Sequence, residues 1–188
     1  VGGLCFISVV KGDDGAIRHL GRPASITFGE RAGDADSERT RAFEALCARA
    51  GIDHLRSPRI ARELWSKYSF LAALAAGTCL MRAGVGRIVA GEGGREFMAA
   101  LHDECLAVAA AEGERVPDAA AATARETLTQ AGSPLQASML RDLQAGHAIE
   151  GEHIVGDMLH RAHAQGIDAP LLATAWVHLQ AYEAQRAA

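Results

Sequence analysis

The chain lacks the features that mark membrane, secreted and nucleic-acid-binding proteins. Its longest apolar run, residues 70–81, is too short to cross a bilayer and is interrupted by Gly77 and Thr78. No secretory signal is visible. The net charge is -4 and the basic residues are scattered, so no surface for nucleic acid or for an anionic membrane is expected.

Cysteine is scarce and is not arranged for metal or disulfide chemistry. The four cysteines, Cys5, Cys47, Cys79 and Cys105, are far apart and lie in apolar segments, and none belongs to a Cys-x-x-Cys pair. This favours reduced, buried thiols in a cytoplasmic protein over a disulfide framework or a zinc site.

The first residues contain no methionine, no leading helix and no glycine-rich fingerprint. The chain begins Val-Gly-Gly and enters an apolar run directly. A few strands and one helix form a thin layer that cannot cover both faces of a sheet. We therefore expect residues 1–56 to be the closing part of a larger α/β domain whose beginning lies outside this sequence.

Among the features that are present, the first 57 residues are rich in strand signals. Strands are expected at residues 4–10, 16–20, 24–28 and 52–55, with a turn at Gly12–Gly15. The short turns predict antiparallel pairing. A helix is expected over residues 38–49, with an N-cap at Asp36–Ser37 and a stop at Gly51.

From Ser57–Pro58 onward almost all of the chain is expected to be helical, with Ser57 as a cap and Pro58 in the first turn. The glycines and Pro170 separate helices near 58–76, 92–112, 117–131, 134–146, 150–166 and 169–187. With 188 residues, 49% of them hydrophobic, the chain can bury a core. The fold class is therefore α+β, with a small partial α/β sheet in residues 1–56 and a mostly helical domain in residues 57–188.

Lys67 is the one cation in a segment that otherwise reads as a buried helix, residues 64–76. Burial of an ammonium group costs several kcal/mol unless the group is paired or its pKa falls. Lys67 therefore either reaches the surface along its aliphatic stem or is held in place to move a proton.

Two segments of this helical part resemble the C-terminal domain of the ketopantoate reductase (2-dehydropantoate 2-reductase) family. Glu63-Leu-Trp-Ser-Lys67 is similar to the Leu-Trp-x-Lys motif of that family. The stretch from Ser133 to Gly156 is similar to its signature, with Ser-Met at 138–139, Asp142 and Glu150 in the matching order. In the first part of the chain, residues 1–4, Gly21 and residues 26–29 resemble the closing strands of the family's nucleotide-binding domain.

The resemblance implies an NADPH-dependent reductase that converts a 2-oxo acid to a 2-hydroxy acid. It also implies a helical domain like the C-terminal domain of 6-phosphogluconate dehydrogenase. Lys67 would be the general acid that protonates the developing alkoxide. Glu150 would orient the lysine and the cofactor ribose or substrate, and Ser138 would bind the substrate carboxylate. Asp142, counted with the substrate-binding residues, is expected to have a structural or orienting role.

The sequence departs from the family pattern at the substrate site. Leu71 and Ala75 stand four and eight residues after the lysine, where the family usually has asparagines. Ile149 and Gly151, on either side of Glu150, also differ from the usual residues. A site that loses hydrogen-bonding groups discriminates less well for a polar substrate. The departures favour a bulkier or more apolar 2-oxo acid than ketopantoate, or a decayed site.

Other interpretations remain open. Glu150 and His153 have the Glu-x-x-His spacing of di-iron bundles, but such a site needs a second motif, so no metal is expected. The chain could instead be a non-catalytic helical association domain that pairs with another copy or another chain. As a part of a reductase, the chain would need the missing nucleotide-binding domain. Without that domain we expect incomplete NADP(H) binding and some self-association of the chain.

Overall fold

The computed structural model describes residues 1–7, 9–12, 14–19, 24–32 and 36–187. Contacts among Cα atoms divide the chain into two compact units, Val1–Leu64 and Trp65–Ala188. Within the described ranges, no helix is long and apolar enough to cross a membrane. Gly21, one of the residues that carry the family resemblance, lies outside the described residues.

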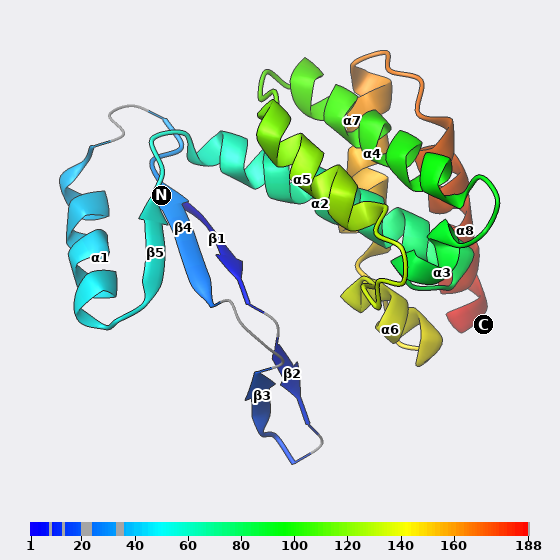
Figure 1. The fold of residues 1–188 in the computed structure, drawn as a ribbon, viewed down its shortest axis with the longest axis horizontal. Helices are drawn as coiled ribbons and strands as arrows, with labels where there is room; N and C mark the ends of the chain where they lie inside the picture. The colour runs from blue at the N-terminus through cyan, green and yellow to red at the C-terminus, as the bar shows by residue number, and fades with distance from the viewer. Residues whose placement is uncertain (8, 13, 20–23, 33–35, 188) are drawn as a thin grey trace. The chain divides into compact units, whose positions relative to one another are not determined.

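The first unit is built on a three-stranded sheet with the order β1-β4-β5. Strand β1 spans Gly2–Phe6, β4 spans Ser25–Gly29 and β5 spans Asp53–Arg56. β1 and β4 are antiparallel, whereas β4 and β5 are parallel. Helix α1, Glu38–Arg49, connects the two parallel strands, because a parallel pair cannot be joined by a tight turn (Figure 1).

The prediction of a single strand over residues 4–10 is wrong. The chain leaves the three-stranded sheet after Phe6, and Val9–Lys11 forms β2, which pairs with β3, Ile17–His19, as a separate antiparallel hairpin (Figure 1). The physical reason is the register of the larger sheet. Phe6 pairs with Ser25, the first residue of β4, so a longer β1 would have no partner there.

The predicted cap of α1 is confirmed. The Ser37 hydroxyl accepts a hydrogen bond from the backbone N–H of Thr40, which satisfies one of the open donors at the helix start. On the sheet side, the rings of Phe28 and Phe43 meet edge to face with centroids 4.6 Å apart. The helix is thereby fixed against the sheet by an aromatic contact.

The second unit consists of helices around one apolar core. After α2, Ile60–Met81, follow α3, Val85–Val89; α4, Gly94–Ala111; α5, Asp118–Leu128; and α6, Ser138–Gln144. A π-helical turn, η1, spans Glu152–Gly156, and α7, Asp157–Ala164, and α8, Pro170–Arg186, complete the unit (Figure 1). The buried core includes Leu101, Leu140, Met158 and Leu172.

Helix α2 does not end at residue 76, as the sequence suggested, but continues through Gly77 to Met81. A Cβ atom at Gly77 would lie 2.5 Å from the Sδ atom of Met98 on α4. The absence of a side chain at Gly77 therefore allows α2 and α4 to approach each other closely. A glycine in a helix weakens it only modestly, and the packing offsets that cost.

Two further differences involve the segment before α6. Helix α3 was not expected, because Gly84 and Gly86 read as breaks. In the structure Gly84 is the N-cap and the N–H groups of Val85 and Gly86 donate to the carbonyl oxygens of Leu135 and Ser133. Since these bonds hold the 133–135 segment along the start of α3, α6 begins at Ser138 and not at residue 134.

Candidate functional site

Helix α2 carries three of the candidate residues on one stripe. Lys67, Leu71 and Ala75 follow each other at intervals of four residues, which places them on one helix face. Lys67 is partly buried, Leu71 is 37% exposed and Ala75 is 2% exposed. Of the three side chains, only that of Lys67 can donate a proton.

Helix α6 brings Ser138 and Asp142 to the far end of this stripe. The backbone N–H of Ala137, just before Ser138, lies 3.5 Å from the Oγ1 atom of Thr78 on α2. Ser138 is exposed in the first turn of α6. Asp142 is one turn later, and its Oδ1 atom lies 3.9 Å from the Nδ1 atom of His147. The two residues therefore share one face of α6, as their spacing predicted.

Glu150 lies two residues before the π-helical turn, on a segment that contacts the other end of the stripe. Its carbonyl oxygen accepts a hydrogen bond from the N–H of Ile154. Its side chain is exposed, and its carboxylate forms no ion pair within 4 Å in the part of the chain that the structure describes. The pairing of Glu150 with Lys67 stays a prediction.

Tyr68, the neighbour of Lys67, ties α2 to this turn. Its hydroxyl lies 2.9 Å from the carbonyl oxygen of Ile154 and 2.8 Å from the Oδ2 atom of Asp157. Tyr68 and Thr78 are ten residues apart, or about 15 Å along α2. The π-helical turn thus meets α2 near Lys67, and α6 meets it near Ala75.

A charged network supports the contact at Tyr68. Arg161 donates to Asp157 through Nε, at 2.8 Å, and to Glu112 through Nη1, also at 2.8 Å. Its guanidinium also lies over the ring of Trp65, 5.5 Å from the centroid. Burial acts to raise the pKa of Asp157, but the hydrogen bonds from Arg161 and Tyr68 outweigh it and lower that pKa.

The sequence reasoning missed this network and the π-helical turn. The spacing of Asp157 and Arg161, four residues apart, is the ordinary signal of an ion pair on a helix and could have been found. No sequence signal marks the turn itself, yet such turns occur often at functional sites. Tyr68 was not singled out in the sequence, although it is the neighbour of Lys67.

The arrangement of the described side chains does not support a metal site. Within the described ranges, no group of three or more histidine, cysteine, aspartate or glutamate residues is placed to hold a metal ion. His153, part of the Glu-x-x-His spacing, is exposed.

Comparison with known proteins gives a family match over most of the second unit. The family described as ketopantoate reductase PanE/ApbA C terminal matches residues 59–183. This range contains Lys67, Ser138, Asp142 and Glu150.

Relatives also match beyond this range. The oxidoreductase YkpB of Bacillus subtilis (strain 168), itself described as uncharacterized, is 34% identical over 186 residues, which are 99% of this chain and 61% of that protein. A 2-dehydropantoate 2-reductase of Halobacterium salinarum is 26% identical over 162 residues, 86% of this chain and 52% of that protein.

A solved structure agrees with the fold. The PanE/ApbA family ketopantoate reductase of Ralstonia eutropha JMP134 superposes with a TM-score of 0.83 at 26% identity, over 99% of this chain and 60% of that one. The mostly helical fold with a small sheet, as predicted from the sequence, is confirmed. The chain spans about half to three fifths of the length of these relatives.

Proposed function

Because the chain belongs to the PanE/ApbA ketopantoate reductase family, we propose that it is the substrate-binding and proton-donating part of a reductase that converts a 2-oxo acid to a 2-hydroxy acid with NADPH. One observation carries the proposal. The family match includes Lys67, Ser138 and Glu150, and the three elements that bear them are in contact through Tyr68 and Thr78.

In this proposal Lys67 is the general acid. It is the only proton donor on its stripe of α2, and it is partly buried. When bound, the reduced nicotinamide supplies the hydride to the keto carbon. The Lys67 ammonium then gives a proton to the oxygen of the former carbonyl, and its charge stabilises the negative oxygen before that transfer.

Ser138 and Asp142 hold and orient the substrate from α6, which contacts α2 through Thr78. The exposed Ser138 hydroxyl in the first turn of α6 can donate a hydrogen bond to the substrate carboxylate. A carboxylate is also favoured near a helix start. Asp142 is half exposed and already near His147, which suits the orienting role that we assign to it.

Glu150 fits a role beside the cofactor. Its carboxylate is exposed and forms no ion pair within the described ranges, so both oxygens can accept hydrogen bonds from ribose hydroxyls. The sequence contains no Gly-x-Gly-x-x-Gly loop. We therefore expect residues 1–188 alone to bind NADPH weakly or not at all, and a fluorescence titration that gave micromolar affinity would contradict this.

Leu71 and Ala75 define the substrate preference. They lie on the same face of α2 as Lys67, and neither can form a side-chain hydrogen bond. Leu71 is 37% exposed, so a substrate whose side group lies against it gains by burying apolar surface. We therefore propose a 2-oxo acid with a bulky or apolar side group.

The full-length protein should be tested against a panel of 2-oxo acids that differ in the size and polarity of the side group, each with NADPH and with NADH. We expect oxidation of NADPH with the highest kcat/KM for an apolar substrate. Oxidation with none of the panel would remove the reductase proposal and leave the helical association domain as the better interpretation. Size-exclusion chromatography at several concentrations measures that association directly.

A further inference from the structure

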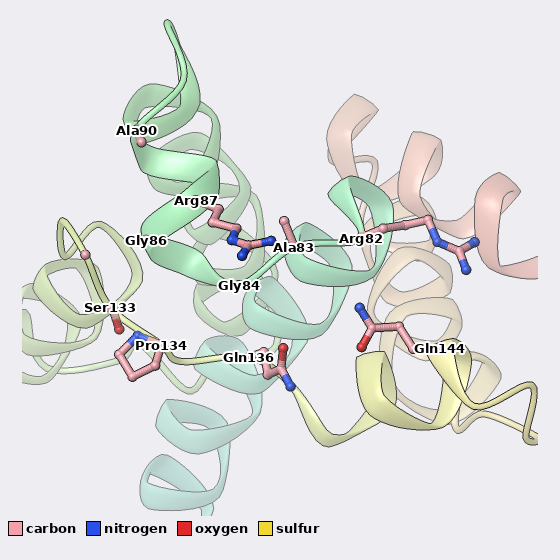
Figure 2. A pocket seen from close by; sticks show the side chains of 11 residues that line it. Arg82, Ala83, Gly84, Gly86, Arg87, Ala90, Ser133, Pro134, Gln136 and Gln144 are labelled. Atoms are coloured by element: carbon pink, nitrogen blue, oxygen red, sulfur yellow. The ribbon is translucent and has the colours of Figure 1, made fainter.

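A pocket with a volume of about 540 Å³ lies where the end of α2 meets α3 and the segment before α6. None of the six residues assigned to proton transfer, to the cofactor or to substrate binding lines it. Figure 2 shows the Arg87 guanidinium and the amides of Gln136 and Gln144 extending toward the space between α3 and α6. Arg82 leaves from the end of α2 and also lines the pocket, and in Figure 2 its guanidinium points away from that of Arg87.

The wall of this pocket is held by backbone contacts. The N–H of Gly86 donates to the carbonyl oxygen of Ser133 at 2.9 Å, and that of Val85 donates to Leu135 at 2.9 Å. A Cβ atom at Gly86 would lie 2.5 Å from the backbone nitrogen of Ser133. The glycine permits a close approach of two backbone segments, and a wall built in this way is formed before any ligand arrives.

The lining is positively charged and contains no carboxylate. Arg82 and Arg87 are exposed, and neither guanidinium lies within 4 Å of a carboxylate in the described part of the chain. Gln136 and Gln144 add neutral amide donors. Two guanidinium groups without a counter-charge, beside amide N–H groups, form a set of donors that suits an anion.

Arg82 stands where the backbone favours glycine. Its φ is 50°, the only positive φ of a non-glycine residue in the described ranges. The N–H of Ala83 donates to the Thr78 carbonyl and the N–H of Arg82 donates to that of Cys79, which is the Schellman ending of a helix with Arg82 in the left-handed position. Glycine usually occupies that position because other residues are strained there.

We propose that this pocket binds a small organic anion, through a carboxylate or a phosphate group, at a site separate from the reductase site. The Arg87 guanidinium holds the charge, Arg82 adds to the positive charge of the lining, and the amides of Gln136 and Gln144 donate to the remaining oxygens of the anion. A cation is favourable at a helix end in any protein. That effect does not account for the strained position of Arg82, nor for the second arginine and the two amides around one space.

Calorimetric titration of the full-length protein with inorganic phosphate and with succinate, at constant ionic strength, tests the proposal. We expect one site with a dissociation constant on the order of 1 mM for the preferred probe. The comparison of the two probes decides between a phosphate and a carboxylate ligand. Arg87→Gln and Arg82→Gly should each weaken binding by about tenfold, which corresponds to about 1.4 kcal/mol.

Two controls test whether anion binding is specific to this pocket. Arg141→Gln removes the same charge from an exposed arginine of α6 that does not line the pocket, and it should leave the affinity unchanged. Lys67→Ala should also leave it unchanged, which distinguishes the pocket from the reductase site. Arg82→Gly should weaken binding without lowering Tm, because glycine relieves the positive φ. Equal binding by the wild type and both pocket variants, or no binding by the wild type, would overturn the proposal.

Discussion

The hydroxyl of Tyr68 lies 2.9 Å from the carbonyl oxygen of Ile154, and this contact joins the helix that bears Lys67 to the turn that follows Glu150. In a π-helical turn the backbone hydrogen bonds are rearranged, and a side-chain donor can satisfy a carbonyl group there. Because Tyr68 is next to Lys67 on α2, we expect this contact to help to position the proposed acid.

Tyr68→Phe should reduce stability and turnover together. The loss of the Tyr68 hydroxyl leaves the Ile154 carbonyl oxygen and a carboxylate oxygen of Asp157 without this donor, at a cost of about 1–3 kcal/mol in the free energy of unfolding. We expect kcat to fall about tenfold and the pH profile of kcat to shift, because the Lys67 amine loses its alignment.

Tyr182→Phe is the matched control for that variant. The Tyr182 hydroxyl also donates to a backbone carbonyl oxygen, that of His147, at 2.6 Å. Urea unfolding should show a loss of about 0.5–1.5 kcal/mol, with kcat and its pH profile unchanged. If both variants changed kcat equally, Tyr68 would have no special role in positioning.

Lys67→Ala in the full-length enzyme should lower kcat about 100-fold or more, the range of a lost general acid. Lys67→Arg should recover little, since a guanidinium keeps the charge but does not release its proton near neutral pH. Lys11, the only other lysine of the chain, is exposed on β2, so Lys11→Ala serves as the control and should retain full activity. Wild-type turnover by Lys67→Ala would exclude this residue from the mechanism.

Leu71→Asn should shift the substrate preference toward polar 2-oxo acids. The new amide can form a hydrogen bond with a substrate hydroxyl, and such a bond changes selectivity by about 0.5–1.5 kcal/mol, or about two- to tenfold in the ratio of kcat/KM values. Leu71 is 37% exposed, so the variant should fold. Val177→Asn, at a 64% exposed position of α8, controls for the general effect of the replacement, and an identical shift there would refute the assignment of Leu71.

Gly86→Ala should destabilise the protein by about 1–3 kcal/mol, measured by urea unfolding. The added Cβ atom would meet backbone atoms of residues 132 and 133 at 2.5–2.6 Å, and backbone cannot move aside cheaply. Gly77→Ala is the comparison, because its Cβ atom would meet only the flexible ends of Met98 and Leu101. We expect a smaller loss there, partly offset by the better helix propensity of alanine.

The stability of the protein should fall as the pH drops from 6.5 toward 4, because of His102. Burial, with the nearby Arg125, lowers the pKa of His102 to about 4 from its ordinary 6.5, and Asp103 opposes the shift. Between these values the unfolded chain binds more protons than the folded one, so the free energy of unfolding decreases with falling pH, by on the order of 3 kcal/mol in total.

Urea unfolding at pH 6.5, 5.5 and 4.5 measures this dependence. His102→Gln should flatten it, whereas His153→Gln, at an exposed position, should leave it as in the wild type. Glu30 does not contribute to the pH dependence of stability between pH 6.5 and 4.5. Hydrogen bonds from Arg39 and Ser37 lower its pKa to about 2, so the stability that it contributes is lost only below about pH 4.5. An equal slope in both histidine variants would show that His102 is not responsible.

Local signals in the sequence were sufficient for most of the helices and for the cap of α1. Ser37 before an acidic first turn predicted the start of α1, and the apolar run around Lys67 predicted α2. The order of Lys67, Ser138, Asp142 and Glu150 along the chain carried the family resemblance. These features depend on neighbours in the chain, which the sequence shows directly.

The glycines were the least predictable residues. Gly77 and Gly86 read as breaks, but each lies inside a helix where another segment comes close. The separation of β1 from β2 likewise depends on where β4 begins, 18 residues or more along the chain. In each case the deciding contact is remote in sequence, and no local pattern records it.

The sequence by itself determined which side chains are available for chemistry: a lysine in an apolar helix, a serine and an aspartate one turn apart, and a glutamate after a break. Tertiary structure alone decided that Tyr68 contacts the π-helical turn and that Arg82 and Arg87 line one pocket. The physical reason is that residue type and helix period are properties of the local chain. The meeting of two helices depends on how their side chains pack, which involves residues far apart in the sequence.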